Sequence, residues 1–269
     1  MLAQIRWTIL FTAILWSAFA SADRQPEDDE RLIDDPRVQH MSYVSTVTGE
    51  TIPYALFIPS SYDPDNAASP LIVGLHGLGR SYDWLMGYHG FLDYAEQLGF
   101  VIVTPLGYTR RGWYGSRATP DPEDGIHSEE DVMDVIAEVR EAYRIDENRI
   151  YMFGHSMGGA GTYHIAQKNP YLFAGLAVAA PAPEIDQSPE VLASIQQVPI
   201  LVLQGTADAL VPVEMTRRWV SAMKSLGMQH LYVELEGADH SLFISQNREN
   251  MRKVMHFFDI TRRRYPAVR

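Results

Sequence analysis

The sequence contains no cysteine among its 269 residues. This absence excludes structural disulfides, zinc sites built from thiolates, cysteine nucleophiles and lipid attachment through an N-terminal cysteine. Basic residues are also scarce, because 22 Lys and Arg stand against 34 Asp and Glu, for a formal net charge of -12. An acidic surface repels phosphate groups, so we expect no nucleic-acid partner and no adsorption to anionic lipid.

Long apolar runs are absent beyond the N-terminus, where Arg6 precedes an apolar run from Trp7 to Phe19. Small residues that fit the A-x-A cleavage pattern stand at Ala18, Ala20 and Ala22. The run is shorter than the roughly 20 residues that span a bilayer. We therefore predict that residues 1–22 are a secretory signal peptide and not an uncleaved anchor. The mature protein is then secreted or periplasmic, with no stable membrane insertion.

The remaining composition is that of a globular protein. Hydrophobic residues make up 46% of the chain and charged residues 21%. Residues 23–37 are acidic and contain proline, and they are predicted to form a flexible arm because they can bury little apolar surface. Residues 38–262 are predicted to form one folded domain that carries the chemistry, and residues 263–269 a basic C-terminal tail.

Apolar strand patterns alternate with helical patterns along this domain, which favours an α/β fold with a mostly parallel central sheet covered by helices on both faces. The turn Thr48-Gly49-Glu50 predicts an antiparallel hairpin at the N-terminal edge. The predicted strands are 43–47, 52–58, 71–75, 100–104, 150–153, 173–179, 200–203 and 231–235. The predicted helices are one that begins at a capping box of Ser128 and Asp131, and those at 157–168, 213–226 and 247–260. Such a sheet carries its chemistry at the carboxyl ends of its strands.

The segment Gly154-His155-Ser156-Met157-Gly158 fits the G-x-S-x-G pattern between a predicted strand and a predicted helix. A sharp strand-to-helix turn strains the serine backbone, so the positions two residues away on either side must lack a side chain. The turn exposes the hydroxyl and aims the positive helix end at a developing oxyanion. Ser156 is therefore predicted to be a nucleophile, whereas the alternative is a serine that only caps a helix. We expect a packing role for His155.

A serine nucleophile needs a histidine base and an acid that orients it. In proteins with this motif the order along the chain is Ser, acid, His. Of the downstream histidines, His240 alone falls in a loop after a late strand, whereas the others fall in helices or at a strand start: His164, His230 and His256. Asp208 follows the strand 200–203 and is the predicted acid. The alternative acids are Asp239 and, more distantly, Asp186.

An oxyanion needs two hydrogen-bond donors, of which one is expected to be the backbone N–H of Met157. The other is assigned to Leu78 N–H, with Gly79 as second choice, in the loop His76-Gly77-Leu78-Gly79-Arg80. Aromatic residues gather in the loops after two strands, where they either line an apolar pocket or pad the loops: Tyr82, Trp84, Tyr88, Tyr108, Trp113 and Tyr114. The predicted substrate-binding residues are Trp113 and Tyr82 from this set, together with Gly79 of the preceding loop.

These segments resemble the α/β-hydrolase esterases related to polyhydroxybutyrate depolymerases and feruloyl esterases. The likeness covers nearly the whole domain: Ile52–Pro59, His76-Gly77, Tyr143–Asp146, the motif Gly154–Gly159, and the surroundings of Asp208 and His240. The resemblance implies an α/β-hydrolase fold and a secreted serine esterase that forms an acyl-enzyme on Ser156. It also implies a small-molecule or polymeric ester substrate and no metal or organic cofactor.

The chain departs from these relatives in ways that bear on the substrate. Cysteines common in them are missing here, including any near the oxyanion loop, which leaves the substrate open. The segment 180–199 has no room for a large cap domain, so we expect an uncapped cleft. An exported serine peptidase of prolyl-oligopeptidase type is the alternative activity, although the gating domain usual in such peptidases is missing. A non-catalytic binding protein is the other alternative, against which the intact Ser, Asp and His argue.

Overall fold

The structure is a computed structural model that describes residues 32–263. The predicted signal peptide, most of the predicted arm and the tail after Arg263 lie outside the described residues. Within the described range no helix combines the length and the apolar character that crossing a membrane requires.

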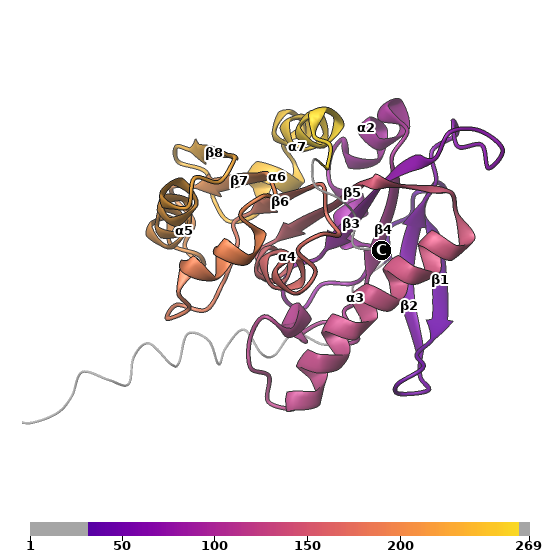
Figure 1. The fold of residues 1–269 in the computed structure, drawn as a ribbon, viewed down its shortest axis with the longest axis horizontal. Helices are drawn as coiled ribbons and strands as arrows, with labels where there is room; N and C mark the ends of the chain where they lie inside the picture. The colour runs from indigo at the N-terminus through magenta and orange to yellow at the C-terminus, as the bar shows by residue number, and fades with distance from the viewer. Residues whose placement is uncertain (1–31, 264–269) are drawn as a thin grey trace, which may run out of the picture. The chain divides into compact units, whose positions relative to one another are not determined.

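One eight-stranded sheet forms the centre of the domain, in the order β1-β2-β4-β3-β5-β6-β7-β8 (Figure 1). All pairs from β4 to β8 along this order are parallel, whereas β1 with β2 and β2 with β4 are antiparallel. The strands are β1 (Gln39–Val44), β2 (Thr51–Phe57), β3 (Ser69–Leu75), β4 (Val101–Pro105), β5 (Ile145–His155), β6 (Gly175–Ala179), β7 (Ile200–Gly205) and β8 (His230–Leu235). The predicted parallel sheet with an antiparallel N-terminal edge is confirmed.

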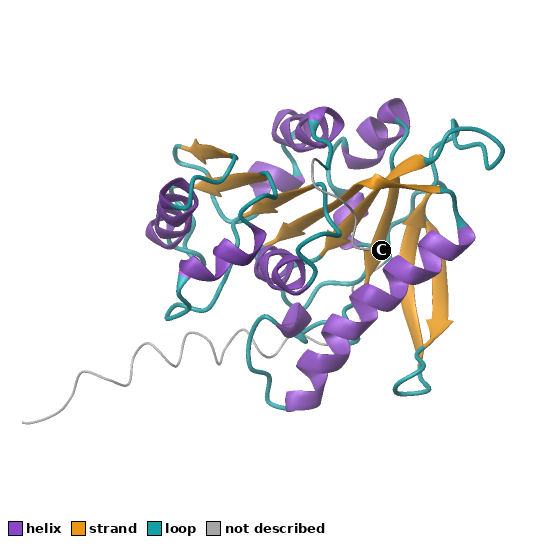
Figure 2. Cartoon of the chain, viewed as in Figure 1, coloured by secondary structure: helices purple, strands orange, loops and turns teal. Residues whose placement is uncertain are grey.

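Helices cover both faces of the sheet, and each face has its own apolar core (Figures 1 and 2). On one face α3 (Pro122–Ala142), α4 (Met157–Lys168) and α5 (Val213–Ser225) pack against the sheet. On the other face lie α2 (Phe91–Leu98) and α7 (Arg248–Ile260), which also contact each other. The short elements are η1 (Trp84–Gly87), η2 (Trp113–Gly115), η3 (Pro189–Ile195) and α6 (Leu242–Ser245).

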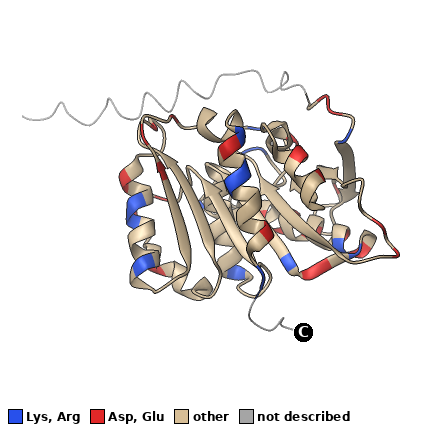
Figure 3. Ribbon diagram, turned by 90° about the horizontal axis from the view of Figure 1, so that it is seen from above, with Lys and Arg blue, Asp and Glu red and all other residues tan. Residues whose placement is uncertain are grey.

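The central strands are apolar on both faces because both faces are covered. Every residue of β4, β6 and β7 is buried, which is the pattern expected of parallel strands between two helical layers. Charged residues lie mainly on helices and loops, and the middle of the sheet carries almost none (Figure 3). The link from β6 to β7 holds only η3, so the predicted absence of a large cap is confirmed.

The predicted start of the helix at Ser128 is wrong. Helix α3 begins at Pro122, after Asp121, whose side chain accepts a hydrogen bond from Glu123 N. Proline suits the first helical turn, where its missing N–H costs nothing. Ser128 lies buried inside the helix, and its hydroxyl accepts a hydrogen bond from Tyr114 N at 3.0 Å. The sequence pattern also gave no indication of α2 or α6.

The last residues of the predicted arm pack against the domain. Ile33 N donates to a carboxylate oxygen of the buried Asp83 at 2.6 Å, and Arg37 forms an ion pair with Asp93 on α2 at 3.0 Å. A buried carboxylate needs donors, and Ile33 supplies one. Residues 32–37 therefore contact the domain and do not extend away from it.

Asp131 on α3 fixes the loop that follows β4. One carboxylate oxygen accepts from Gly107 N at 2.5 Å and Tyr108 N at 3.0 Å, and the other accepts from the Tyr43 hydroxyl at 2.7 Å. Burial raises the pKa of this carboxyl, against the effect of the three hydrogen bonds. A single buried side chain thus joins α3 to the antiparallel edge and to a loop at the carboxyl edge of the sheet.

We predict that Asp131→Ala lowers the free energy of unfolding by about 2 to 4 kcal/mol, since it leaves three donors without their acceptor. Urea denaturation measures the effect. The matched control is Glu141→Ala, an exposed residue of the same helix, which should change stability by less than about 0.5 kcal/mol. Equal stability of the two variants would contradict the role given to Asp131.

Candidate active site

Ser156 stands at a strained turn between β5 and α4. Its φ of 57° and ψ of -115° lie in a region that residues other than glycine rarely adopt. A Cβ on Gly154 would lie 2.0 Å from Gly158 O, and a Cβ on Gly158 would lie 2.0 Å from Leu75 O. The turn therefore requires glycine at both positions, as the motif predicted.

Three side chains that the sequence singled out form one chain of hydrogen bonds. His240 Nε2 lies 2.9 Å from Ser156 Oγ, and His240 Nδ1 lies 2.7 Å from Asp208 Oδ2. They come from the loops after β5, β7 and β8, which meet at the carboxyl edge of the sheet. A carboxylate accepts hydrogen bonds only, so Nδ1 carries the imidazole proton. Nε2 is then free to accept the proton of the serine hydroxyl.

Asp208 is held as a carboxylate by the donors around it. Its Oδ1 accepts from Leu210 N and Val211 N, each at 2.8 Å, and its Oδ2 accepts from Gln204 Nε2 at 3.0 Å. Burial raises the pKa of this carboxyl, but the hydrogen bonds from His240, Val211 and Leu210 outweigh burial and leave the pKa below its usual value. Asp208 is therefore ionised at neutral pH.

The rival acids are placed elsewhere. Asp239 Oδ1 accepts from Ser241 N at 3.1 Å and Leu242 N at 2.8 Å, so this side chain satisfies the free N–H groups at the start of α6. Asp186 is exposed in the link between β6 and β7.

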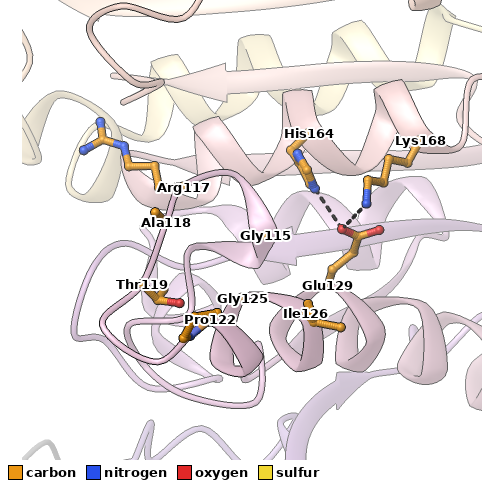
Figure 4. Close-up of a pocket in the computed structure, with 10 residues that line it drawn as sticks. All are labelled: Gly115, Arg117, Ala118, Thr119, Pro122, Gly125, Ile126, Glu129, His164 and Lys168. Atoms are coloured by element: carbon orange, nitrogen blue, oxygen red, sulfur yellow. Dashed lines mark hydrogen bonds and ion pairs between the residues drawn. The ribbon is translucent and has the colours of Figure 1, made fainter.

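The other downstream histidines also form no contact with Ser156 within the described residues. His164 lies on α4, and its Nε2 is 2.8 Å from Glu129 Oε2, which also accepts from Lys168 at 2.9 Å. These residues border a hollow of about 340 Å³ that contains none of Ser156, Asp208 and His240 (Figure 4). His230, the first residue of β8, has its Nδ1 3.0 Å from Met228 O, and His256 is exposed on α7.

The two backbone segments assigned to the oxyanion hole lie against each other. The contact of Gly158 with Leu75 O brings the start of α4 up to the loop after β3. Met157 is the first residue of α4, so its N–H has no partner within the helix. Among the described residues neither Met157 N nor Leu78 N donates a hydrogen bond. Tyr114 also fixes this loop, because its buried hydroxyl accepts a hydrogen bond from His76 N at 3.0 Å.

The residues predicted to bind substrate occupy three different settings. Trp113 is half-buried beneath the Arg117 guanidinium, 4.0 Å from the ring centre, and Arg117 donates to Ala182 O at 2.6 Å. Ala182 N in turn donates to Ser156 O, so Trp113 is linked to the Ser156 turn through Arg117 and Ala182. Gly79 has a φ of 76° and donates to Arg110 O, which ties two loops together. The Tyr82 hydroxyl contacts His40 on the edge strand β1, away from β5.

Sequence reasoning missed the hydrogen bonds of His155. This side chain is buried, as its expected packing role requires, but Nε2 lies 2.9 Å from His240 O and Nδ1 lies 2.5 Å from the Tyr88 hydroxyl. No sequence signal links these positions, since 85 residues separate His155 from His240. Contact between them arises only once β8 returns to the sheet that contains β5.

Several known proteins are similar to this chain. Residues 125–262, just over half of the chain, match the family model described as PETase: PET hydrolase-like. A bifunctional acetylxylan esterase/xylanase from Neocallimastix patriciarum is 33% identical over 105 residues, which are 38% of this chain and 15% of that protein. Cutinase 2 from Thermobifida cellulosilytica is 31% identical over 144 residues, which are 53% of this chain and 50% of the cutinase. The chain thus spans half or less of the length of these curated relatives.

A solved structure supports the fold. The ferulic acid esterase of Anaeromyces mucronatus in complex with ferulic acid has a TM-score of 0.66 at 21% identity, over 87% of this chain and 94% of that chain. The structure of the same esterase without substrate has a TM-score of 0.67 at 22% identity. Likeness at this level of identity concerns the fold alone. The predicted α/β-hydrolase fold and the resemblance to the feruloyl esterase group are confirmed.

We predict that Gly158→Ala lowers the free energy of unfolding by about 3 kcal/mol or prevents folding, because its Cβ would meet the Leu75 backbone. Gly125→Ala in the first turn of α3 is the matched control. The Cβ there meets nothing closer than 3.6 Å, so alanine should be neutral or add about 0.5 to 1 kcal/mol. Urea denaturation compares the two variants, and a stable Gly158→Ala protein would contradict the contact.

Proposed function

The chain belongs to the PET hydrolase-like family, and from this membership and the hydrogen bonds at Ser156 we propose that it is a serine hydrolase of carboxylic esters. The observation that carries the proposal is the chain from Ser156 Oγ through His240 to Asp208, on a strained turn that fixes the hydroxyl. We assign Ser156 as nucleophile, His240 as general base and acid, and Asp208 as the orienting carboxylate.

The reaction follows from the positions of the protons. Ser156 Oγ attacks the ester carbonyl while its proton passes to His240 Nε2, and Asp208 stabilises the imidazolium that forms. We assign the N–H groups of Met157 and Leu78 to the oxyanion, where one lost donor costs ~100- to 1,000-fold in rate. The imidazolium then protonates the leaving alcohol, and water activated by the same histidine releases the acid from the acyl-enzyme.

The side chains around this chain of hydrogen bonds favour an apolar substrate. The segments that follow β3, β6, β7 and β8 each expose one large aliphatic residue at the carboxyl edge of the sheet, and we infer that these four side chains form an apolar ring around Ser156: Leu78 (44% exposed), Ile185 (76%), Leu210 (69%) and Leu242 (52%). Leu210 follows Asp208 by two positions, and Leu242 follows His240 by two. Clustered apolar exposure is typical of a binding surface. With no large cap above it, this ring suits a bulky or polymeric ester.

Export is part of the proposal and rests on the N-terminal sequence. The basic residue, apolar run and small residues over 1–22 fit a cleaved signal peptide. Mass spectrometry of the protein from the culture medium or periplasm tests it, because cleavage after a small residue near Ala22 should remove the apolar run. An intact N-terminus would contradict export by this route.

We predict that Ser156→Ala abolishes turnover of p-nitrophenyl acetate and that Asp208→Asn lowers kcat by ~1,000- to 10,000-fold, because asparagine favours the wrong imidazole tautomer. Asp239→Asn is the matched control, since an asparagine oxygen still accepts the backbone hydrogen bonds at the start of α6, and its kcat should stay near wild type. A larger loss in Asp239→Asn than in Asp208→Asn would overturn the assignment of the acid. Turnover of peptides without turnover of esters would favour the peptidase alternative.

We predict that Leu210→Asn lowers the rate on an insoluble aliphatic polyester by about tenfold. Burial of one aliphatic side chain against the substrate contributes roughly 1.5 kcal/mol, which corresponds to about that factor. Its rate on p-nitrophenyl acetate should be unchanged, since we expect that ester to be too small to reach the Leu210 side chain. Leu231→Asn is the matched control, because Leu231 is 54% exposed but lies near the amino end of β8, at the opposite edge of the sheet. Equal loss in both variants would contradict an apolar binding ring, and rates on methyl ferulate would show whether aryl esters also fit.

A further inference from the structure

His155 occupies a buried aromatic setting directly before the nucleophile. Only 1% of its surface is exposed. Its ring stacks on Trp84, with centroids 5.5 Å apart and planes 11° from parallel, and meets the edge of Tyr88 at 6.0 Å. It also lies 5.1 Å from the His240 ring. A nucleophile motif does not require a buried imidazole here, so the polar atoms of this ring need an explanation.

Both ring nitrogens of His155 have one partner each, and the partners determine the tautomer. His240 O is a carbonyl and accepts only, so His155 Nε2, 2.9 Å away, carries the proton. In a neutral imidazole Nδ1 then holds a lone pair, and the Tyr88 hydroxyl at 2.5 Å donates to it. Burial, with a smaller contribution from His240, lowers the pKa of His155 to about 3. The ring is therefore neutral at working pH, with both of its hydrogen-bonding positions used.

The bond to His240 O joins two parts of the sheet that the strand ladders do not connect directly. The strands β5 and β8 are separated by β6 and β7. Ala238 O and Gly237 N in the loop after β8 bond to Ala207 N and Thr206 Oγ1, which follow β7. Within the described residues the carbonyl of His240 bonds to His155 alone. This bond thus ties the base directly to the strand that carries the nucleophile.

We propose that His155, with its tautomer fixed by Tyr88, is a positioning residue that holds the backbone of His240 against the nucleophile strand while Asp208 holds the His240 ring. The inference rests on the proposed function, because it assigns His240 as the base. Two fixed points, one on the backbone and one on the ring, leave the imidazole little freedom to turn away from Ser156. A displacement of about 1 Å in such a group can cost ~100-fold in rate.

His155→Phe tests the proposal, because phenylalanine keeps a ring against Trp84 and removes both hydrogen bonds. We expect kcat for p-nitrophenyl acetate to fall ~10- to 100-fold with KM within about twofold, since the base and not the substrate is displaced. His155→Gln can donate to His240 O and accept from Tyr88, and it should recover kcat to within about threefold of wild type. The proposal would be overturned if kcat fell as much in His155→Gln as in His155→Phe, or if His155→Phe kept the wild-type kcat.

Tyr88→Phe removes only the hydroxyl and gives a second, independent readout. Its kcat should fall ~3- to 10-fold, because one of the two hydrogen bonds that hold the His155 ring is lost. Because Tyr88 acts through His155, the double variant with His155→Phe should be no slower than His155→Phe alone, whereas unrelated residues would give multiplied losses. Multiplied losses overturn the proposal. If His155→Phe does not fold, an unchanged kcat in Tyr88→Phe overturns the proposal instead.

Tyr163→Phe is the matched control for a buried tyrosine hydroxyl. Tyr163 is buried on α4, and its hydroxyl has no hydrogen-bond partner among the described residues. Its removal should leave kcat unchanged, and a loss equal to that of Tyr88→Phe would show that general packing explains both. Failure of the proposed function would be recognised separately, because the Ser156→Ala variant would then hydrolyse the ester at the wild-type rate.

Discussion

The contact on which the site depends is the one between the bare backbone of Gly158 and the carbonyl of Leu75. It holds the first turn of α4 against the end of β3, with no space for even a Cβ. Two features accompany this approach: the positive φ of Ser156, and the position of the start of α4 against the end of β3 and His76. The strain at Ser156 persists because the strands on both sides of β5 are buried and paired.

Around this turn, parallel pairing brings distant parts of the chain to one edge. β5, β7 and β8 point the same way, so the loops after them deliver Ser156, Asp208 and His240 to the same end of the sheet. Buried polar groups then set the finer geometry: Asp131 fixes the loop after β4, Tyr114 supports the loop after β3, and His155 reaches the His240 carbonyl. The rigid sheet gives the approximate placement and these hydrogen bonds complete it.

Sequence patterns could indicate the sheet, the motif at Ser156 and the order of the candidate residues, because each depends on local features: apolar strands, glycine spacing and loop position. They could not separate Asp208 from Asp239 by geometry, since that choice depends on Asp239 capping α6. The start of α3 was missed because the buried, periodic stripe begins after a polar first turn led by Pro122. The hydrogen bond from His155 to His240 could not be predicted from the sequence, because it depends on tertiary packing of β8.

The central claim is that Ser156 is the nucleophile of an ester hydrolase. Reaction of the intact protein with a fluorophosphonate, followed by proteolysis and mass spectrometry, tests it most directly. The account predicts a single phosphonyl adduct on the peptide that contains Ser156, absent from Ser156→Ala and formed far more slowly in a variant without the His240 imidazole. An adduct on another residue, or none in a protein that hydrolyses esters, would contradict it.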